Sequence, residues 1–156
     1  MDESMTYLKE KFGLGEVDIH SYSPLTLAYM GDAAYEIVIR TILVDMGNRQ
    51  PSKLHRLSSG LVKAATQAAM AEAILPVLTE EEEQVYLRGR NAKSPTMAKH
   101  ATVGDYRKAT GFEALMGYLY LAGEYRRMTD LIYEGLRAVK DDREKKQAAG
   151  PEGEKA

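Results

Sequence analysis

Apolar residues recur every three or four positions along most of this chain, which is the spacing of amphipathic helices. The clearest series runs from Leu25 to Leu43 and follows Ser23-Pro24, a serine N-cap before a proline at the first helical position. Gly47 supplies a C-terminal stop, so we predict a helix over about 24–46. Because its apolar positions cover more than one narrow stripe, we expect this helix to be buried on most sides.

Glycine, proline and capping residues divide the remaining chain into six shorter helices. We predict them over about 1–12, 51–57, 61–75, 80–87, 106–121 and 124–139. The expected breaks lie at Ser58-Ser59-Gly60 and Gly89, and the expected N-caps are Thr79 and Asp105. Residues 89–104 read as a loop with one possible turn over 94–99. No segment alternates as a strand would, so the prediction is an all-α fold of about seven helices.

The length of 156 residues suits one domain with a sizeable core. We place this domain at residues 1–140. Residues 141–156 are charged and have few apolar anchors, so we expect a disordered tail. The chain has no Cys, which excludes disulfides and thiolate chemistry. It also has no apolar run of membrane-spanning length and no signal-like N-terminus, so we expect a cytoplasmic protein with no membrane partner.

Positive charge is concentrated in one segment, although the net charge of the chain is −2. Residues 88–108 contain one acid, Asp105, and six cations: Arg88, Arg90, Lys93, Lys99, Arg107 and Lys108. Lys and Arg on a glycine-containing loop suit binding of a phosphate backbone. Charge alone favours the alternative, an ordinary solvated loop.

Two carboxylates are the candidates for catalysis. Asp32 lies four residues from both Ala28 and Glu36, so the three share one helix face; Glu113 similarly shares a face with Thr110 and Gly117. If these faces meet, Asp32 and Glu113 form a pair that cannot ionise fully without a cation. Oxygen ligands favour Mg²⁺ or Mn²⁺, which can activate water for attack on a phosphoryl group. A structural ion pair is the alternative.

The segment Leu27-Ala28-Tyr29-Met30-Gly31-Asp32-Ala33 resembles the signature helix of the ribonuclease III endonuclease family. Phe112-Glu113-Ala114-Leu115-Met116-Gly117 resembles the second motif of that family, and Arg88-Gly89-Arg90-Asn91-Ala92-Lys93 resembles the basic segment between the two. The likeness spans roughly residues 20–140. It is strongest to the Mini-III subfamily, which has no double-stranded-RNA-binding domain, and we expect none here.

This resemblance implies an endoribonuclease that hydrolyses double-stranded RNA and leaves 5′-phosphate and 3′-hydroxyl ends. It implies that Asp32 and Glu113 are catalytic metal ligands for Mg²⁺, with Mn²⁺ as a substitute, and that the protein is a homodimer. The six cations become candidate RNA contacts. For the subfamily, the implied substrate is the 23S ribosomal RNA precursor in bacteria, with a possible ribosomal-protein helper.

Two acids of the family pattern are missing. The Glu expected four residues before Asp32 is Ala28, and the Asp expected three residues before Glu113 is Thr110. Glu36 is a possible compensating acid. These departures keep open a catalytically silent RNA-binding or ribosome-assembly module. A plain helical dimerisation or regulatory domain is a third alternative, which the two-motif match disfavours.

Overall fold

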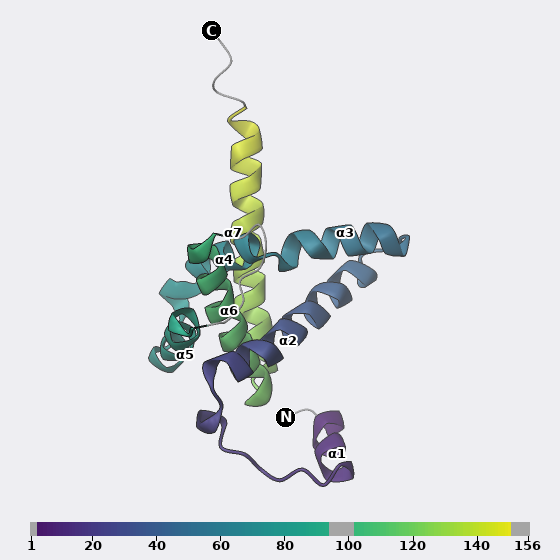
Figure 1. The fold of residues 1–156 in the computed structure, drawn as a ribbon. Helices are drawn as coiled ribbons and strands as arrows, with labels where there is room; N and C mark the ends of the chain where they lie inside the picture. The colour runs from purple at the N-terminus through teal and green to yellow at the C-terminus, as the bar shows by residue number, and fades with distance from the viewer. Residues whose placement is uncertain (1–2, 94–101, 151–156) are drawn as a thin grey trace.

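The computed structural model describes residues 3–93 and 102–150, and this part of the chain contains helices and no strands. Seven α-helices follow one another with two short 3-10 helices (Figure 1). Their bounds are α1 (Glu3–Lys11), η1 (Ile19–Ser21), α2 (Pro24–Asp45), α3 (Pro51–Val62), α4 (Ala64–Ile74), η2 (Leu75–Val77), α5 (Glu80–Asn91), α6 (Val103–Leu121) and α7 (Tyr125–Ala148). The all-α prediction is confirmed.

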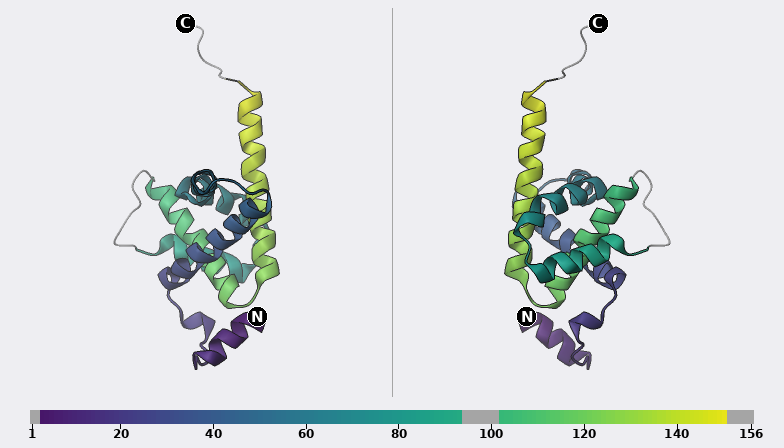
Figure 2. Two further views of the ribbon diagram at one scale, coloured as in Figure 1. Left: turned by 90° about the vertical axis from the view of Figure 1, so that its right-hand side faces the viewer. Right: turned by 90° about the vertical axis from the view of Figure 1, so that its left-hand side faces the viewer.

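Helix α6 is the centre of the packing, with α2, α4 and α5 against it (Figure 1). Its apolar residues at spacings of three and four are buried on several sides, including Phe112, Leu115, Met116 and Leu119. They share one core with Tyr35 and Ile39 of α2, Met70 and Ile74 of α4, and Leu131 and Ile132 of α7. Figure 2 shows α7 running past this core and projecting beyond it. Helix α1 has no buried residue, and the sulfur of its Met5 accepts a hydrogen bond from the Tyr120 hydroxyl of α6 (3.5 Å).

The break between α3 and α4 lies at Lys63, so the predicted break at Ser58-Ser59-Gly60 is wrong. Two side chains of α4 explain its position. The Thr66 hydroxyl donates to the Gly60 carbonyl (2.7 Å), and the Gln67 amide donates to the Val62 carbonyl (2.9 Å). They satisfy carbonyls that have no intrahelical partner at the end of α3.

Three helix ends also differ from the predictions. Helix α5 continues through Gly89 to Asn91, because Gly89 is buried against α6. Helix α6 begins at Val103, capped by Thr102, whose hydroxyl accepts from the Asp105 backbone N–H (3.0 Å). Helix α7 extends past Val139 to Ala148, a stretch for which we had expected disorder. The predicted turn over 94–99 lies outside the described residues.

The acidic start of α5 has a structural role. Thr79 and Glu82 form a reciprocal capping box, and Glu82 is buried. Arg127 of α7 donates to both oxygens of Glu82 (2.8 and 2.9 Å) and to the Val77 carbonyl (2.7 Å). This network ties the ends of η2, α5 and α7 together. None of the described helices has the length and apolarity needed to cross a membrane.

Candidate active site

Helices α2 and α6 cross at two glycines, and this crossing positions the candidate carboxylates. A Cβ added to Gly31 would overlap the carbonyl oxygen of Glu113, and one added to Gly117 would overlap that of Leu27. The two backbones therefore approach more closely than any larger residue permits. Sequence analysis assigned no role to these glycines, although each lies in a quoted motif within four residues of Asp32 or Glu113.

Asp32 and Glu113 meet at this crossing, as the shared helix faces predicted. Their carboxyl groups lie close enough for a side-chain hydrogen bond. Burial, reinforced by the negative charge and hydrogen bond of Asp32, raises the pKa of Glu113 to about 8. At neutral pH the raised pKa therefore favours the protonated form of Glu113.

The expectation that α2 is buried on most sides is wrong. Asp32 itself is exposed, and so is an apolar stripe on the same outer side of α2. Tyr29 keeps 82% and Ile37 keeps 60% of their surface exposed, and Ala33 between them is also exposed. One face of α2 packs on α6, whereas Tyr29, Ala33 and Ile37 lie on a face that is left exposed. Asp32 is therefore not buried in the single chain.

The positions that depart from the family pattern have local structural roles. Ala28 is buried in a small apolar cluster with Leu27, Val85 and Ala114, where a carboxylate would lose its hydration. The Thr110 hydroxyl donates to the Tyr106 carbonyl of its own helix (3.0 Å). Glu36 accepts a hydrogen bond from Arg40 (2.6 Å), so its charge is already partnered.

The donor set at the crossing fits a small divalent cation. Glu113, whose pKa is raised to about 8, would bind such an ion by releasing its proton. No third Asp, Glu or His completes a cluster of three within residues 3–93 and 102–150. This sparse set suits Mg²⁺, which keeps several waters and takes only one or two carboxylates from the protein.

The predicted RNA-binding cations occupy the ends of α5 and α6. Arg88 and Lys93 are exposed, and Arg90 is half-buried, with its Nε donating to the Asn91 side chain (3.3 Å). Arg107 is exposed on the first turns of α6. Lys108 is ion-paired with Glu72 of α4, which offsets its charge. Lys99 lies outside the described residues.

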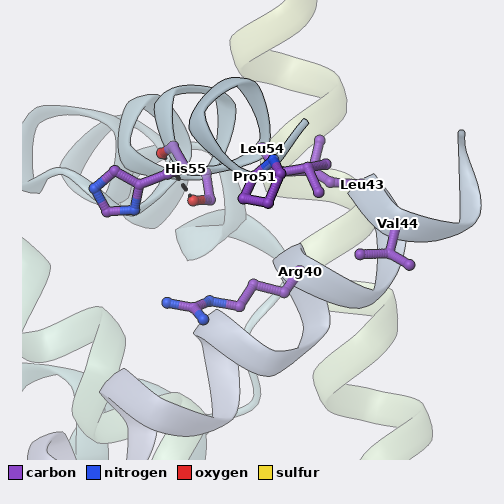
Figure 3. Close-up of a pocket in the computed structure, with 7 residues that line it drawn as sticks. Arg40, Leu43, Val44, Pro51, Leu54 and His55 are labelled. Atoms are coloured by element: carbon purple, nitrogen blue, oxygen red, sulfur yellow. Dashed lines mark hydrogen bonds between the residues drawn. The ribbon is translucent and has the colours of Figure 1, made fainter. Parts of the chain in front are cut away.

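A separate cavity of about 360 Å³ lies between the C-terminal half of α2 and helix α3 (Figure 3). Leu43, Val44, Pro51 and Leu54 line it together with Arg40, His55 and Ser58. Neither Asp32 nor Glu113 is among these residues, so this cavity holds neither of the two carboxylates that lie in the family motifs. The crossing of α2 and α6 is therefore the better candidate.

Comparison with known proteins bears on this site directly. Residues 25–124 match the model of the Ribonuclease III domain family. A Mini-ribonuclease 3 of Enterococcus faecalis is 49% identical over 82% of this chain and 98% of its own length. One of a Thermoanaerobacter species is 42% identical over 90% of this chain and all of its own length.

A solved structure shows the same arrangement of helices. The crystal structure of a protein from Fusobacterium nucleatum superposes with a TM-score of 0.70 at 31% identity, covering 78% of this chain and 98% of that one. The prediction of an endoribonuclease is thereby confirmed. The chain belongs to the ribonuclease III family of metal-dependent double-stranded-RNA endoribonucleases and, within it, to the Mini-ribonuclease 3 subfamily.

Proposed function

We propose that Asp32 and Glu113 together bind Mg²⁺, for which Mn²⁺ can substitute, and that the enzyme uses this site to cut duplex RNA. The close approach of the two carboxyl groups at the crossing of α2 and α6 is the observation that carries the proposal, since two neighbouring carboxylates favour a cation between them. When bound, the ion activates a water and offsets the charge that develops on the scissile phosphate.

The two residues have distinct tasks in this scheme. Glu113 releases its proton to become a ligand, so its raised pKa makes binding of the ion dependent on pH. Asp32 is exposed and lies on the side of the crossing that an RNA strand can reach. Arg88, Arg90, Lys93 and Arg107 hold the phosphate backbone near this point, and the products carry 5′-phosphate and 3′-hydroxyl ends.

A homodimer is part of the proposal, and the exposed stripe of α2 supports it. Tyr29, Ala33 and Ile37 are spaced by four residues and lie uncovered beside Asp32. An apolar stripe of this kind is typical of a surface that associates with another. Pairing two copies through α2 would present two carboxylate sites to one duplex, one for each strand.

The substrate we propose is the duplex at the ends of the 23S ribosomal RNA precursor in a bacterial cytoplasm, with a ribosomal protein as a possible helper. The 40–50% identity to several Mini-ribonucleases 3 supports this assignment. An A-form duplex is recognised through its phosphates and 2′-hydroxyls rather than by its sequence. The cationic ends of α5 and α6 suit that mode.

Cleavage of a precursor-end duplex in the presence of Mg²⁺ tests the site and the substrate. We expect the parent to cut it and to leave 5′-phosphate ends, and we expect Asp32→Asn and Glu113→Gln each to lower kcat by at least about 100-fold, since each removes a metal-binding charge. Glu134→Gln, at an exposed ion pair on α7, is the matched control. If both variants cut as well as the parent, Asp32 and Glu113 are not metal ligands. If the parent cuts only unrelated duplexes and leaves the precursor-end duplex intact, the precursor is not its substrate.

Sedimentation equilibrium tests the homodimer. We expect the parent to sediment as a dimer at micromolar concentration and Tyr29→Ser to shift it toward monomer. Tyr133→Ser is the control, because Tyr133 is similarly exposed (64%) but lies on α7. A monomeric parent, or an equal shift in both variants, would contradict assembly through α2.

A further inference from the structure

The outward face of α5 carries Arg88 and, beside it, two polar side chains to which no role has been assigned, Gln84 and Asn91. Gln84, Arg88 and Asn91 are spaced by four and three residues, so they share one face, and all three are exposed. The opposite face holds the buried Val85, Tyr86 and Gly89. Together with Pro24 and Leu87, the three polar residues line an open hollow of about 520 Å³ between α5 and the start of α2.

This hollow lies beside the catalytic crossing. Along α2, Pro24, Ala28 and Asp32 follow one another at intervals of four residues, so the face that borders the hollow continues to Asp32. Along α5, Gly89 packs closely on the Thr110 carbonyl, one helical turn before Glu113. An RNA strand with its scissile phosphate at Asp32 and Glu113 would therefore pass this face with its flanking nucleotides.

The chemistry of the face fits ribose and phosphate. No ion pair of Arg88 occurs in the described part of the chain, so its guanidinium is available for a phosphate. The Asn91 side-chain oxygen accepts from Arg90, which leaves its NH₂ group to donate. A carboxamide both donates and accepts, as a ribose 2′-hydroxyl does, and it carries no charge.

We propose that Gln84 and Asn91 bind ribose 2′-hydroxyls of the duplex next to the scissile bond, with Arg88 on a neighbouring phosphate. The inference concerns how the enzyme prefers RNA over DNA. It rests on the action of the family on duplex RNA and not on the identity of the metal ligands or the precursor. A protein partner has no ribose 2′-hydroxyl, so its binding to this face would not depend on that group.

A binding experiment with modified duplexes tests the proposal. The probes are an all-RNA duplex and the same duplex with 2′-deoxynucleotides flanking the cleavage position, both measured by fluorescence anisotropy in EDTA so that no cutting occurs. Deoxy substitution should weaken binding to the parent about tenfold, which is the loss of one or two hydrogen bonds. For Gln84→Ala/Asn91→Ala we expect less than a twofold difference between the probes. Gln147→Ala on α7 should respond like the parent.

Three results would overturn the proposal. They are equal affinity of the parent for both probes, an undiminished preference for RNA in the double variant, or parental affinity of the double variant for the all-RNA duplex. The last result would assign the face to something other than RNA. The substitutions are at exposed positions, and circular dichroism would verify the fold; Gln84→Ser and Asn91→Ser provide a second pair. Since binding is measured without metal, failure of the proposed metal site would leave this test intact.

Discussion

Gly31 of α2 and Gly117 of α6 face each other across the helix crossing, so closely that a Cβ on Gly31 would lie 2.7 Å from the Gly117 backbone nitrogen. Contact of this kind allows no side chain. Because Asp32 follows Gly31 directly, the separation of the two backbones also sets the separation of the two carboxyl groups. We therefore expect stability and catalysis to depend on the same contact.

Gly117→Ala should separate α2 from α6. The new methyl group would overlap the Leu27 carbonyl, so we expect a loss of about 2–3 kcal/mol in the free energy of unfolding and a fall in cleavage rate. Urea denaturation and duplex cleavage measure the two effects. Gly104→Ala, near the start of α6, meets nothing within 4 Å and should be neutral or slightly stabilising. Similar behaviour of both variants would contradict the role of the crossing.

Metal affinity should rise with pH. The pKa of Glu113 is about 8, so below that value a proton competes with the ion for the site. We expect the affinity for Mn²⁺ to fall by roughly tenfold for each pH unit below about 7. Calorimetric titration with Mn²⁺ between pH 5.5 and 8.5 would show it. A pH-independent affinity would mean that Glu113 is no ligand, and in Glu113→Gln the dependence should vanish along with tight binding.

The metal-free protein should become less stable as the pH rises. The pKa of Glu113 is raised from 4.5 to about 8 in the folded state, so between these values the folded protein binds more protons than the unfolded chain. Stability from this group is thus present below pH 4.5 and is lost as the pH approaches 8. Glu113→Gln should be more stable than the parent at pH 8 and equal to it near pH 4.5, as measured by urea unfolding in EDTA. If Glu113→Gln were instead less stable than the parent at pH 8, the pKa of Glu113 would not be raised in the folded state.

Arg127→Ala should destabilise the fold strongly. It would leave the Glu82 carboxylate buried without its partner, a change that costs about 3 kcal/mol. The hydrogen bond from Arg127 is the main cause of the lowered pKa of Glu82, so the contribution of the pair should disappear as the pH falls. Arg137→Ala breaks an exposed pair with Glu134 and should cost less than about 1 kcal/mol. Thermal unfolding measures the stability of the two variants. An equal loss of stability in both would mean that the network between η2, α5 and α7 has no special structural role.

The salt dependence of RNA binding should separate available cations from paired ones. Replacing Arg88 or Lys93 by Ala should each reduce the slope of log K against log[salt] by up to about 0.9, because each removes one phosphate contact. Lys108→Ala should change the slope much less, since Lys108 already forms an ion pair with Glu72. Binding to a duplex from 50 to 300 mM salt measures these slopes. A larger effect at Lys108 than at Arg88 would contradict the assignment.

Local signals explain why much of the fold was predictable. Ser23-Pro24 and the Thr79 N-cap start helices where the sequence predicted them, because capping bonds form within one turn of chain. Of the helix ends that were predicted wrongly, the end of α5 depends on a helix distant in the sequence, and the α3–α4 break depends on side chains five and six residues from the carbonyls they bind. Gly89 continues a helix because α6 lies against it, and the α3–α4 break lies at Lys63 because Thr66 and Gln67 bind the carbonyls there.

The sequence by itself determined the all-α class, the family motifs and the pair Asp32 and Glu113, since periodicity and motif spacing are properties of the chain alone. Only the tertiary structure decided how the pair is held. Two facing glycines, far apart in sequence, remove the side chains that would keep the helices separate, and burial with a like charge then protonates Glu113. It also decided that Asp32 is exposed beside an uncovered apolar stripe, because exposure depends on which face of a helix meets a neighbour.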